Sequence, residues 1–105
     1  MNLEFLDNAT ADVTRSSRWY DTQPGRYGAA FEDEVEIAIE KIAENPRMYS
    51  PVEDGIPGRE YREYFIGRFE QRVIYEVKSD TVLVVAVVLA FSSEGFWQRN
   101  LRSTT

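Results

Sequence analysis

The sequence has 105 residues, of which 43% are hydrophobic and 29% are charged, which predicts one globular domain over residues 1–105 and excludes a disordered or fibrous chain. The net charge of −6 disfavours direct binding to nucleic acid, because phosphate contacts require basic surfaces. The absence of Cys and His excludes disulfides, thiol nucleophiles, imidazole bases and the usual zinc sites.

The charge is unevenly distributed along the chain. Residues 1–58 hold five basic and twelve acidic side chains, whereas residues 59–105 hold seven basic and six acidic ones. Glu4 and Asp7 stand where a secretory signal needs basic residues, and the longest apolar stretch, residues 82–91, is half the roughly 20 residues that a membrane-spanning helix needs. We therefore expect a cytoplasmic protein that does not associate with membranes.

The first half of the chain predicts a short strand followed by two helices. Residues 2–6 alternate weakly, as in a strand, and Asp7 or Asn8 offers a cap for a helix over residues 9–22. The next helix covers residues 26–44, and its apolar residues fall at helical spacing on one face: Phe31, Val35, Ala38, Ile39 and Ile42. A Pro-Gly joint between the helices indicates a helical hairpin.

Residues Glu32, Glu36 and Glu40 line up on another face of the second helix. Without His or a facing set of ligands, this pattern is typical of a solvated helix face and not of a metal site. We expect neither a metal nor another cofactor.

The second half predicts a loop and three strands. Proline and glycine recur in residues 46–58, and strands are expected over residues 60–66, 69–77 and 81–90, with turns at 67–68 and 79–80 and a tail over 91–105. The near-continuous apolar run of the last strand indicates a central position in a sheet.

The resulting order, β-α-α-β-β-β, predicts an α+β fold in which a helical hairpin packs on one face of a small, mostly antiparallel sheet. We expect the helix residues Phe31, Val35, Ile39 and Ile42 to lie beside Val73, Tyr75 and Val85. The other face of the sheet should be open to a partner.

Along nearly its whole length, the chain resembles the RelE/ParE superfamily of toxins from type II toxin–antitoxin systems, and more closely the ParE branch. The matching features are Trp19-Tyr20, Glu44-Asn45-Pro46, Gly58-Arg59, Arg68-Phe69, Arg72-Val73-Ile74-Tyr75, the strand 82–87 and Phe96-Trp97-Gln98-Arg99. The resemblance implies a toxin held inactive by a cognate antitoxin, with a possible role in plasmid stabilisation. One branch of the superfamily cleaves messenger RNA on the ribosome, and the other poisons DNA gyrase.

The residues argue against the RNA-cleaving branch. Metal-free RNA cleavage needs a base, cations and an acid, and the resemblance implies that Arg and Lys on the sheet and an aromatic hydroxyl near the C-terminus supply them. Arg72 matches one such arginine, but Ser92-Ser93-Glu94 replaces the basic cluster, and Phe96 and Trp97 carry no hydroxyl. We predict no catalytic residues.

Three functions stay open at this point. The first is a toxin that acts by binding, on DNA gyrase, although the segment 89–93 also lacks the His or Arg that commonly follows the last strand in that branch. The second is a ribosome-dependent messenger RNA endonuclease, and the third is a non-toxic partner-binding domain of the same fold.

The candidate partner-binding residues lie in the less acidic second half: Arg59, Arg62, Arg68, Arg72, Trp97 and Arg99. We expect a partly acidic antitoxin segment to cross the open sheet face near Arg62, Arg72 and Arg99, away from the glutamates of the second helix. A structural alternative pairs Arg72 with Glu70 or Glu76 and makes Trp97 an aromatic plug of the core. The sequence leaves open whether the chain forms a homodimer.

Overall fold

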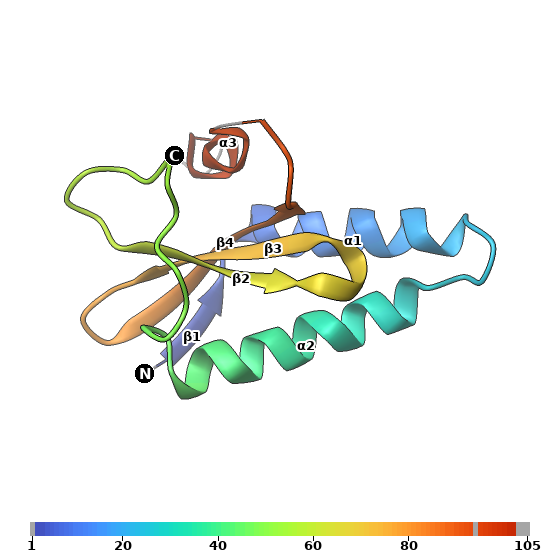
Figure 1. Cartoon of the computed structure of the whole chain (residues 1–105), viewed down its shortest axis with the longest axis horizontal. Helices are drawn as coiled ribbons and strands as arrows, with labels where there is room; N and C mark the ends of the chain where they lie inside the picture. The colour runs from blue at the N-terminus through green and yellow to red at the C-terminus, as the bar shows by residue number, and fades with distance from the viewer. Residues whose placement is uncertain (1, 94, 103–105) are drawn as a thin grey trace.

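The computed structural model describes residues 2–93 and 95–102. Its elements are β1 (Asn2–Phe5), α1 (Asp7–Asp21), α2 (Gly28–Glu44), β2 (Tyr61–Ile66), β3 (Gln71–Val77), β4 (Thr81–Leu89) and α3 (Arg99–Arg102), with 3-10 turns at Gly67–Phe69 and Phe96–Gln98. The strands form one sheet in the order β1-β4-β3-β2, in which only β1 and β4 run parallel (Figure 1). The predicted α+β fold is confirmed. Helix α3 was not predicted and lies in the segment expected to be a tail.

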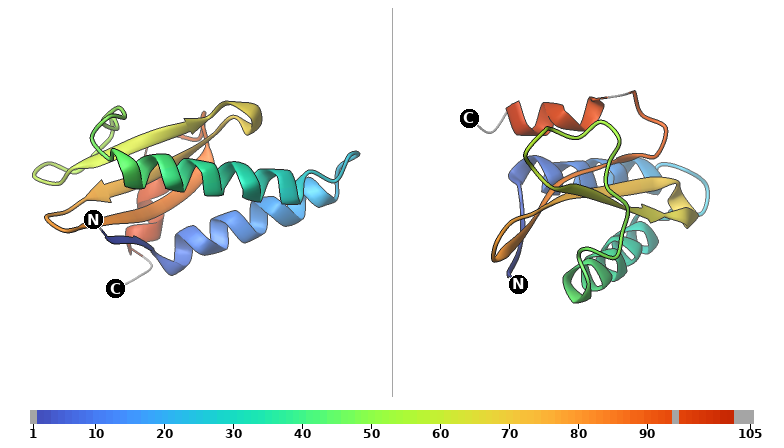
Figure 2. Two further views of the ribbon diagram at one scale, coloured as in Figure 1. Left: turned by 90° about the horizontal axis from the view of Figure 1, so that it is seen from below. Right: turned by 60° about the vertical axis from the view of Figure 1, so that its left-hand side comes forward.

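Helices α1 and α2 lie side by side against one face of the sheet (Figure 2). The apolar stripe of α2 is buried there at Phe31, Val35, Ala38 and Ile42, and it packs against Val73, Tyr75, Val77, Val82, Val84 and Val87 of the sheet. Ile39 is only partly buried, because it follows Ala38 by about 100° around the helix and lies at the flank of the stripe. The prediction that Ile39 belongs to the buried core is thus corrected.

Several predicted boundaries move by one or two residues. Helix α1 already starts at Asp7, with Leu6 at the cap position and no capping side chain, so the predicted cap by Asp7 or Asn8 is wrong. Helix α2 starts at Gly28, whose N–H donates to the Asp21 carboxylate at 2.9 Å. Phe69 belongs to a 3-10 turn and not to β3.

A β-bulge in β4 changes which residues face the helices. The register of β3 against β4 shifts between Ile74 and Tyr75, where the partners change from Ala86 to Val84 and leave Val85 as the extra residue. Before the bulge, Val82 and Val84 face the helices, and after it Val87 does. Val85 itself packs on the opposite face, so its predicted position beside the helix stripe is wrong.

The second face of the sheet is covered and not open as predicted. Ile74, Val85 and Ala86 are fully buried there, beneath the fully buried Trp97 and the loop residue Val52. Helix α3 and the turn before it lie on this side of the sheet, across from α2 (Figures 1 and 2). The reason is that the tail folds back: both the Asp54 carboxylate and the Asp12 carboxylate accept hydrogen bonds from tail residues.

Candidate functional site

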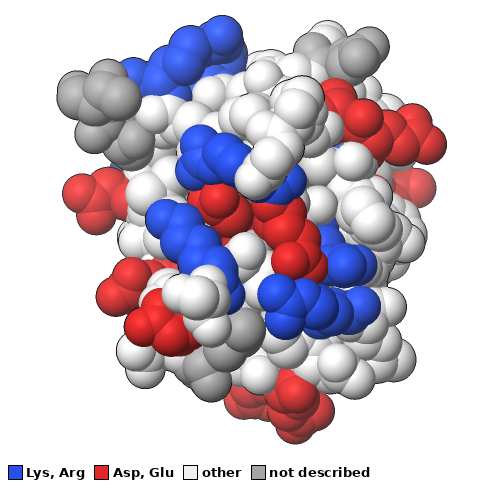
Figure 3. Space-filling model, turned by 90° about the vertical axis from the view of Figure 1, so that its left-hand side faces the viewer, with Lys and Arg blue, Asp and Glu red and all other residues white. Residues whose placement is uncertain are grey.

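The loop before β2 and the ends of β2 and β3 carry a network of alternating cations and carboxylates. Arg59 forms a bidentate pair with Glu76, with N–O distances of 2.9 and 2.8 Å, and Glu76 is only 5% exposed. Glu60 is shared by Arg62 at 2.8 Å and Arg47 at 3.1 Å. These hydrogen bonds raise the pKa of Arg59 and lower the pKa of Glu60. Figure 3 shows blue and red side chains interleaved on this face, which is therefore not a continuous basic patch.

Arg72 points into a polar hollow of about 620 Å³ on the other face of the sheet from the helices. Its Nη1 donates to Glu63 Oε2 at 2.9 Å, whereas its buried Nε has no partner. Glu63 lies on the neighbouring strand, diagonally opposite Arg72. The predicted pairing of Arg72 with Glu70 or Glu76 is wrong, because Glu76 lies four residues further along β3 and Glu70 lies in the turn before it.

The hollow around Arg72 is unsuited to a phosphate group. Three carboxylates line it, those of Glu53, Asp54 and Glu63, against the single cation of Arg72. Burial raises the pKa of Asp54, but hydrogen bonds from Gly95 and Trp97 lower it by more, so this carboxyl stays ionised at neutral pH. The electrostatic field in the hollow would repel a nucleic-acid backbone.

Two tyrosines of the sheet are poor proton-transfer groups, and the described residues form no metal centre. Burial raises the pKa of Tyr61 and of Tyr75 to about 12, so neither hydroxyl exchanges protons readily at neutral pH. Within residues 2–93 and 95–102 no group of three or more acidic side chains could hold a metal ion. Ser92-Ser93-Glu94 stands where the resemblance implies a basic cluster in the RNA-cleaving branch, and Glu94 lies outside the described residues.

The other predicted partner-binding residues lie apart from this hollow. The Arg68 guanidinium stacks on Phe69, 5.3 Å from the ring centroid, and that of Arg99 stacks on Phe96 at 4.0 Å. Trp97 is fully buried, with its indole N–H donating to Asp54 at 3.0 Å, so its prediction as a partner contact is wrong and the aromatic-plug alternative is right. The structure does not gather the predicted residues into one site, and the arginines as partner contacts stay a prediction.

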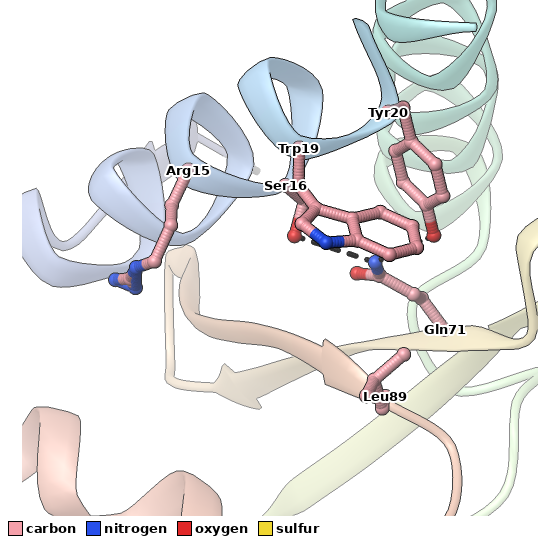
Figure 4. A pocket seen from close by; sticks show the side chains of 6 residues that line it. All are labelled: Arg15, Ser16, Trp19, Tyr20, Gln71 and Leu89. Carbon is pink, nitrogen blue, oxygen red and sulfur yellow. Dashed lines mark hydrogen bonds between the residues drawn. The ribbon is translucent and has the colours of Figure 1, made fainter. Parts of the chain in front are cut away.

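An apolar groove that the sequence analysis missed runs between α1 and the end of β4. One part, of about 320 Å³, is lined by Arg15, Ser16, Trp19, Tyr20, Gln71 and Leu89 (Figure 4). A second hollow, of about 450 Å³, shares Arg15, Ser16, Gln71 and Leu89 with the first and continues to Phe91 and Phe96. The available signal was Trp19, which lies beside Tyr20 on α1 and so cannot share its buried direction.

Among the helices of residues 2–93 and 95–102, none combines the length and the hydrophobicity of a membrane-spanning segment.

Comparisons with known proteins agree with this architecture. Residues 3–89 match a family described as the ParE toxin of the type II toxin–antitoxin system parDE. The fold is similar to a solved structure described as the chromosomal ParDE toxin–antitoxin system from P. aeruginosa, with a TM-score of 0.69 and 20% identity over 85% of this chain and 95% of that chain. No curated protein matches the sequence significantly.

Proposed function

The chain belongs to the ParE toxin family of type II toxin–antitoxin systems, and from this premise we propose that it is a cytoplasmic toxin that binds and poisons DNA gyrase without cutting RNA. A cognate antitoxin neutralises it, and the pair stabilises the plasmid or chromosome that encodes it. Family membership supports the toxin role and the antitoxin partner. The choice of a protein target over RNA rests on the site.

The surroundings of Arg72 carry this choice. A ribonuclease of this fold would need Arg72 to meet a phosphate, yet the guanidinium is held by Glu63 in a hollow with two further carboxylates. Opening that ion pair and bringing a phosphate beside Asp54 would cost both the hydrogen bond and like-charge repulsion. The Tyr61 and Tyr75 hydroxyls are buried with raised pKa values, so neither transfers a proton readily.

Two assays on the purified chain separate the candidate functions. In the first, the chain is added to DNA gyrase, and we expect loss of negative supercoiling or accumulation of cleaved DNA. In the second, it is added to a translating extract with a reporter messenger RNA, and we expect the message to stay intact at the highest chain concentration.

The variants Arg72→Ala and Arg47→Ala serve as a matched pair, since each removes an arginine that is paired with a glutamate. Codon-positioned RNA cleavage that Arg72→Ala abolishes and Arg47→Ala preserves would contradict the proposal and make the chain an endonuclease. If neither gyrase nor RNA is affected and expression does not arrest growth, the chain is a non-toxic partner-binding domain.

A further inference from the structure

The polar hollow around Arg72 carries an excess of negative charge. Among the described residues that line it, Glu53, Asp54 and Glu63 supply carboxylates, whereas Arg72 supplies the only cation. Glu63 gives one oxygen to Arg72, and the Asp54 carboxylate accepts hydrogen bonds from the tail. Glu53 is exposed, and no ion pair among the described residues involves it. The hollow therefore attracts a cation.

The wall of the hollow also contains polar atoms that are buried without a hydrogen-bond partner. Among the described residues these are Arg72 Nε, in a side chain that is 13% exposed, and the Ser92 hydroxyl. Buried polar atoms are nearly always paired, and an unpaired one is costly. These two atoms favour a polar occupant that brings hydrogen-bonding groups of its own, in addition to the positive charge that the carboxylates select.

Other classes of ligand fit the hollow less well. Its carboxylates repel a phosphate group, and in the part of the chain that the structure describes they do not form a group that could hold a metal ion. A guanidinium or ammonium group on an aliphatic stem fits both parts of the lining. The carboxylates can pair with its head, and Pro51 and Ala90 offer apolar contact to its methylene groups. The favoured occupant is thus an Arg or Lys side chain.

Apolar side chains beside the hollow indicate that this basic group belongs to a protein. Met48 is 68% exposed and Phe65 59%, and both line a second hollow of about 380 Å³ that shares Ser50 and Glu63 with the first. Phe65 lies directly opposite Arg72 across β2 and β3, so the two side chains emerge on the same face of the sheet. Exposed apolar groups beside a polar rim are typical of protein interfaces, and a free polyamine would leave them uncovered.

The target proposed above offers such a side chain. A protein that binds DNA exposes Arg and Lys to contact the phosphates. The net charge of −6 on the chain adds an attraction that acts before contact. A basic side chain of the target would thus find, in the hollow, negative charge of the kind that a DNA phosphate supplies.

We propose that the hollow binds an exposed Arg or Lys side chain of DNA gyrase, with its head group beside Glu53 and Glu63 and a neighbouring apolar residue of gyrase against Met48 and Phe65. The inference rests on the proposed function, since it assigns the surface that contacts the target already proposed. The sequence led us to expect an acidic partner at Arg72, whereas the carboxylates around Arg72 select a basic one.

The test measures binding of the full chain to the gyrase holoenzyme, without DNA, by biolayer interferometry. Glu53→Lys should weaken binding about tenfold, because it places a cation where the basic side chain would lie. The matched control is Glu36→Lys, which changes the net charge equally on an exposed position of α2 and should bind like the wild type. Phe65→Ala should weaken binding about fivefold, whereas Ile37→Ala, which removes a side chain that is 42% exposed on α2, should not. Thermal melting checks that each variant is folded.

Two further readouts test the chemistry of the contact. Raising the salt concentration should weaken the wild-type complex more than that of Glu53→Gln, because the variant lacks one of the attracting carboxylates. Equal salt dependence overturns the ionic contact. Spermidine at millimolar concentration should leave the melting temperature of the chain unchanged. A rise that Glu53→Lys abolishes would make the occupant a free polyamine and overturn the inference.

The outcomes separate this inference from the proposed function. A wild-type chain that binds gyrase no better than Glu53→Lys, or equal losses for Glu53→Lys and Glu36→Lys, would place the contact elsewhere and overturn the inference while the proposed function stands. A wild-type chain that neither binds nor inhibits gyrase overturns both. Self-association of the chain alone that Glu53→Lys abolishes would make the occupant a second copy and also overturns the inference.

Discussion

Replacing Asp54 with Ala should loosen the tail from the second face of the sheet. The Asp54 carboxylate accepts hydrogen bonds from the Gly95 N–H at 2.7 Å and from the Trp97 indole at 3.0 Å. Hydrogen bonds to charged groups contribute about 1.5–3 kcal/mol each, and we take the lower part of that range because Asp54 is half-buried. The variant should therefore lose about 2–4 kcal/mol of unfolding free energy.

Urea unfolding at pH 7, followed by circular dichroism and by fluorescence, measures this loss. A Trp19→Phe background leaves Trp97 as the only indole, so its emission reports on the tail directly. The matched control is Glu53→Ala, an exposed neighbour, which should change the unfolding free energy by less than about 0.5 kcal/mol. Equal losses for Asp54→Ala and Glu53→Ala would refute the reasoning that the carboxylate holds the tail.

The pH dependence of this contribution has a definite sign. Burial raises the pKa of Asp54, but the hydrogen bonds lower it by more, so the folded value lies below the unfolded one. The stabilisation is complete above the unfolded pKa, about 3.9, and is lost as the pH falls through the folded pKa. Burial raises the pKa of Asp12, which acts in the opposite direction. The difference between the wild type and Asp54→Asn should thus be constant above about pH 5 and shrink below about pH 4.

Two further stability measurements follow from the packing, and urea unfolding suits both. Phe31→Ala removes a fully buried ring and should cost about 3–5 kcal/mol, whereas Ile39→Ala, at the flank of the stripe, should cost roughly 1–2 kcal/mol; equal costs would contradict the position of Ile39. Arg59→Ala leaves the buried Glu76 carboxylate without its bidentate partner and should cost roughly 1–3 kcal/mol, since Arg59 itself is partly exposed. A double-mutant cycle with Glu76→Gln should show coupling, and strict additivity would mean that the pair contributes nothing.

The elements and the helix-facing core could be predicted because they depend on local patterns. The spacing of Phe31, Val35, Ala38 and Ile42 has the period of a helix, and it places the stripe on the sheet without knowledge of the tertiary structure. The β-bulge in β4, which changes the side chains that face the helices, could not be predicted in this way. One extra residue, Val85, exchanges the faces of everything that follows, and the continuous valine run contains no alternation that would reveal it.

The arginine partners could not be predicted, because they depend on register between strands. Sequence spacing suggested that Arg72 would pair within its own strand, but residues four apart on a strand are about 13 Å apart. The pair with Glu63 exists because β2 places Glu63 opposite Ile74, one diagonal step from Arg72. Local spacing thus identified a cation of potential function and gave no information on the carboxylates that neutralise it.

The tail covers one face of the sheet and adds side chains to the groove beside α1. Trp97 fills the sheet face on which the sequence alone would place an antitoxin, and the turn that carries it brings Phe96 and Phe91 to the groove beside α1. The family match covers residues 3–89, so Trp19 and Leu89 lie within the shared domain while Phe91 and Phe96 lie beyond it. One wall of the groove therefore belongs to the family fold and the other to a segment outside the match. A partner that contacts both walls would distinguish this chain from a relative with a different tail, because discrimination between partners needs contacts that differ between them.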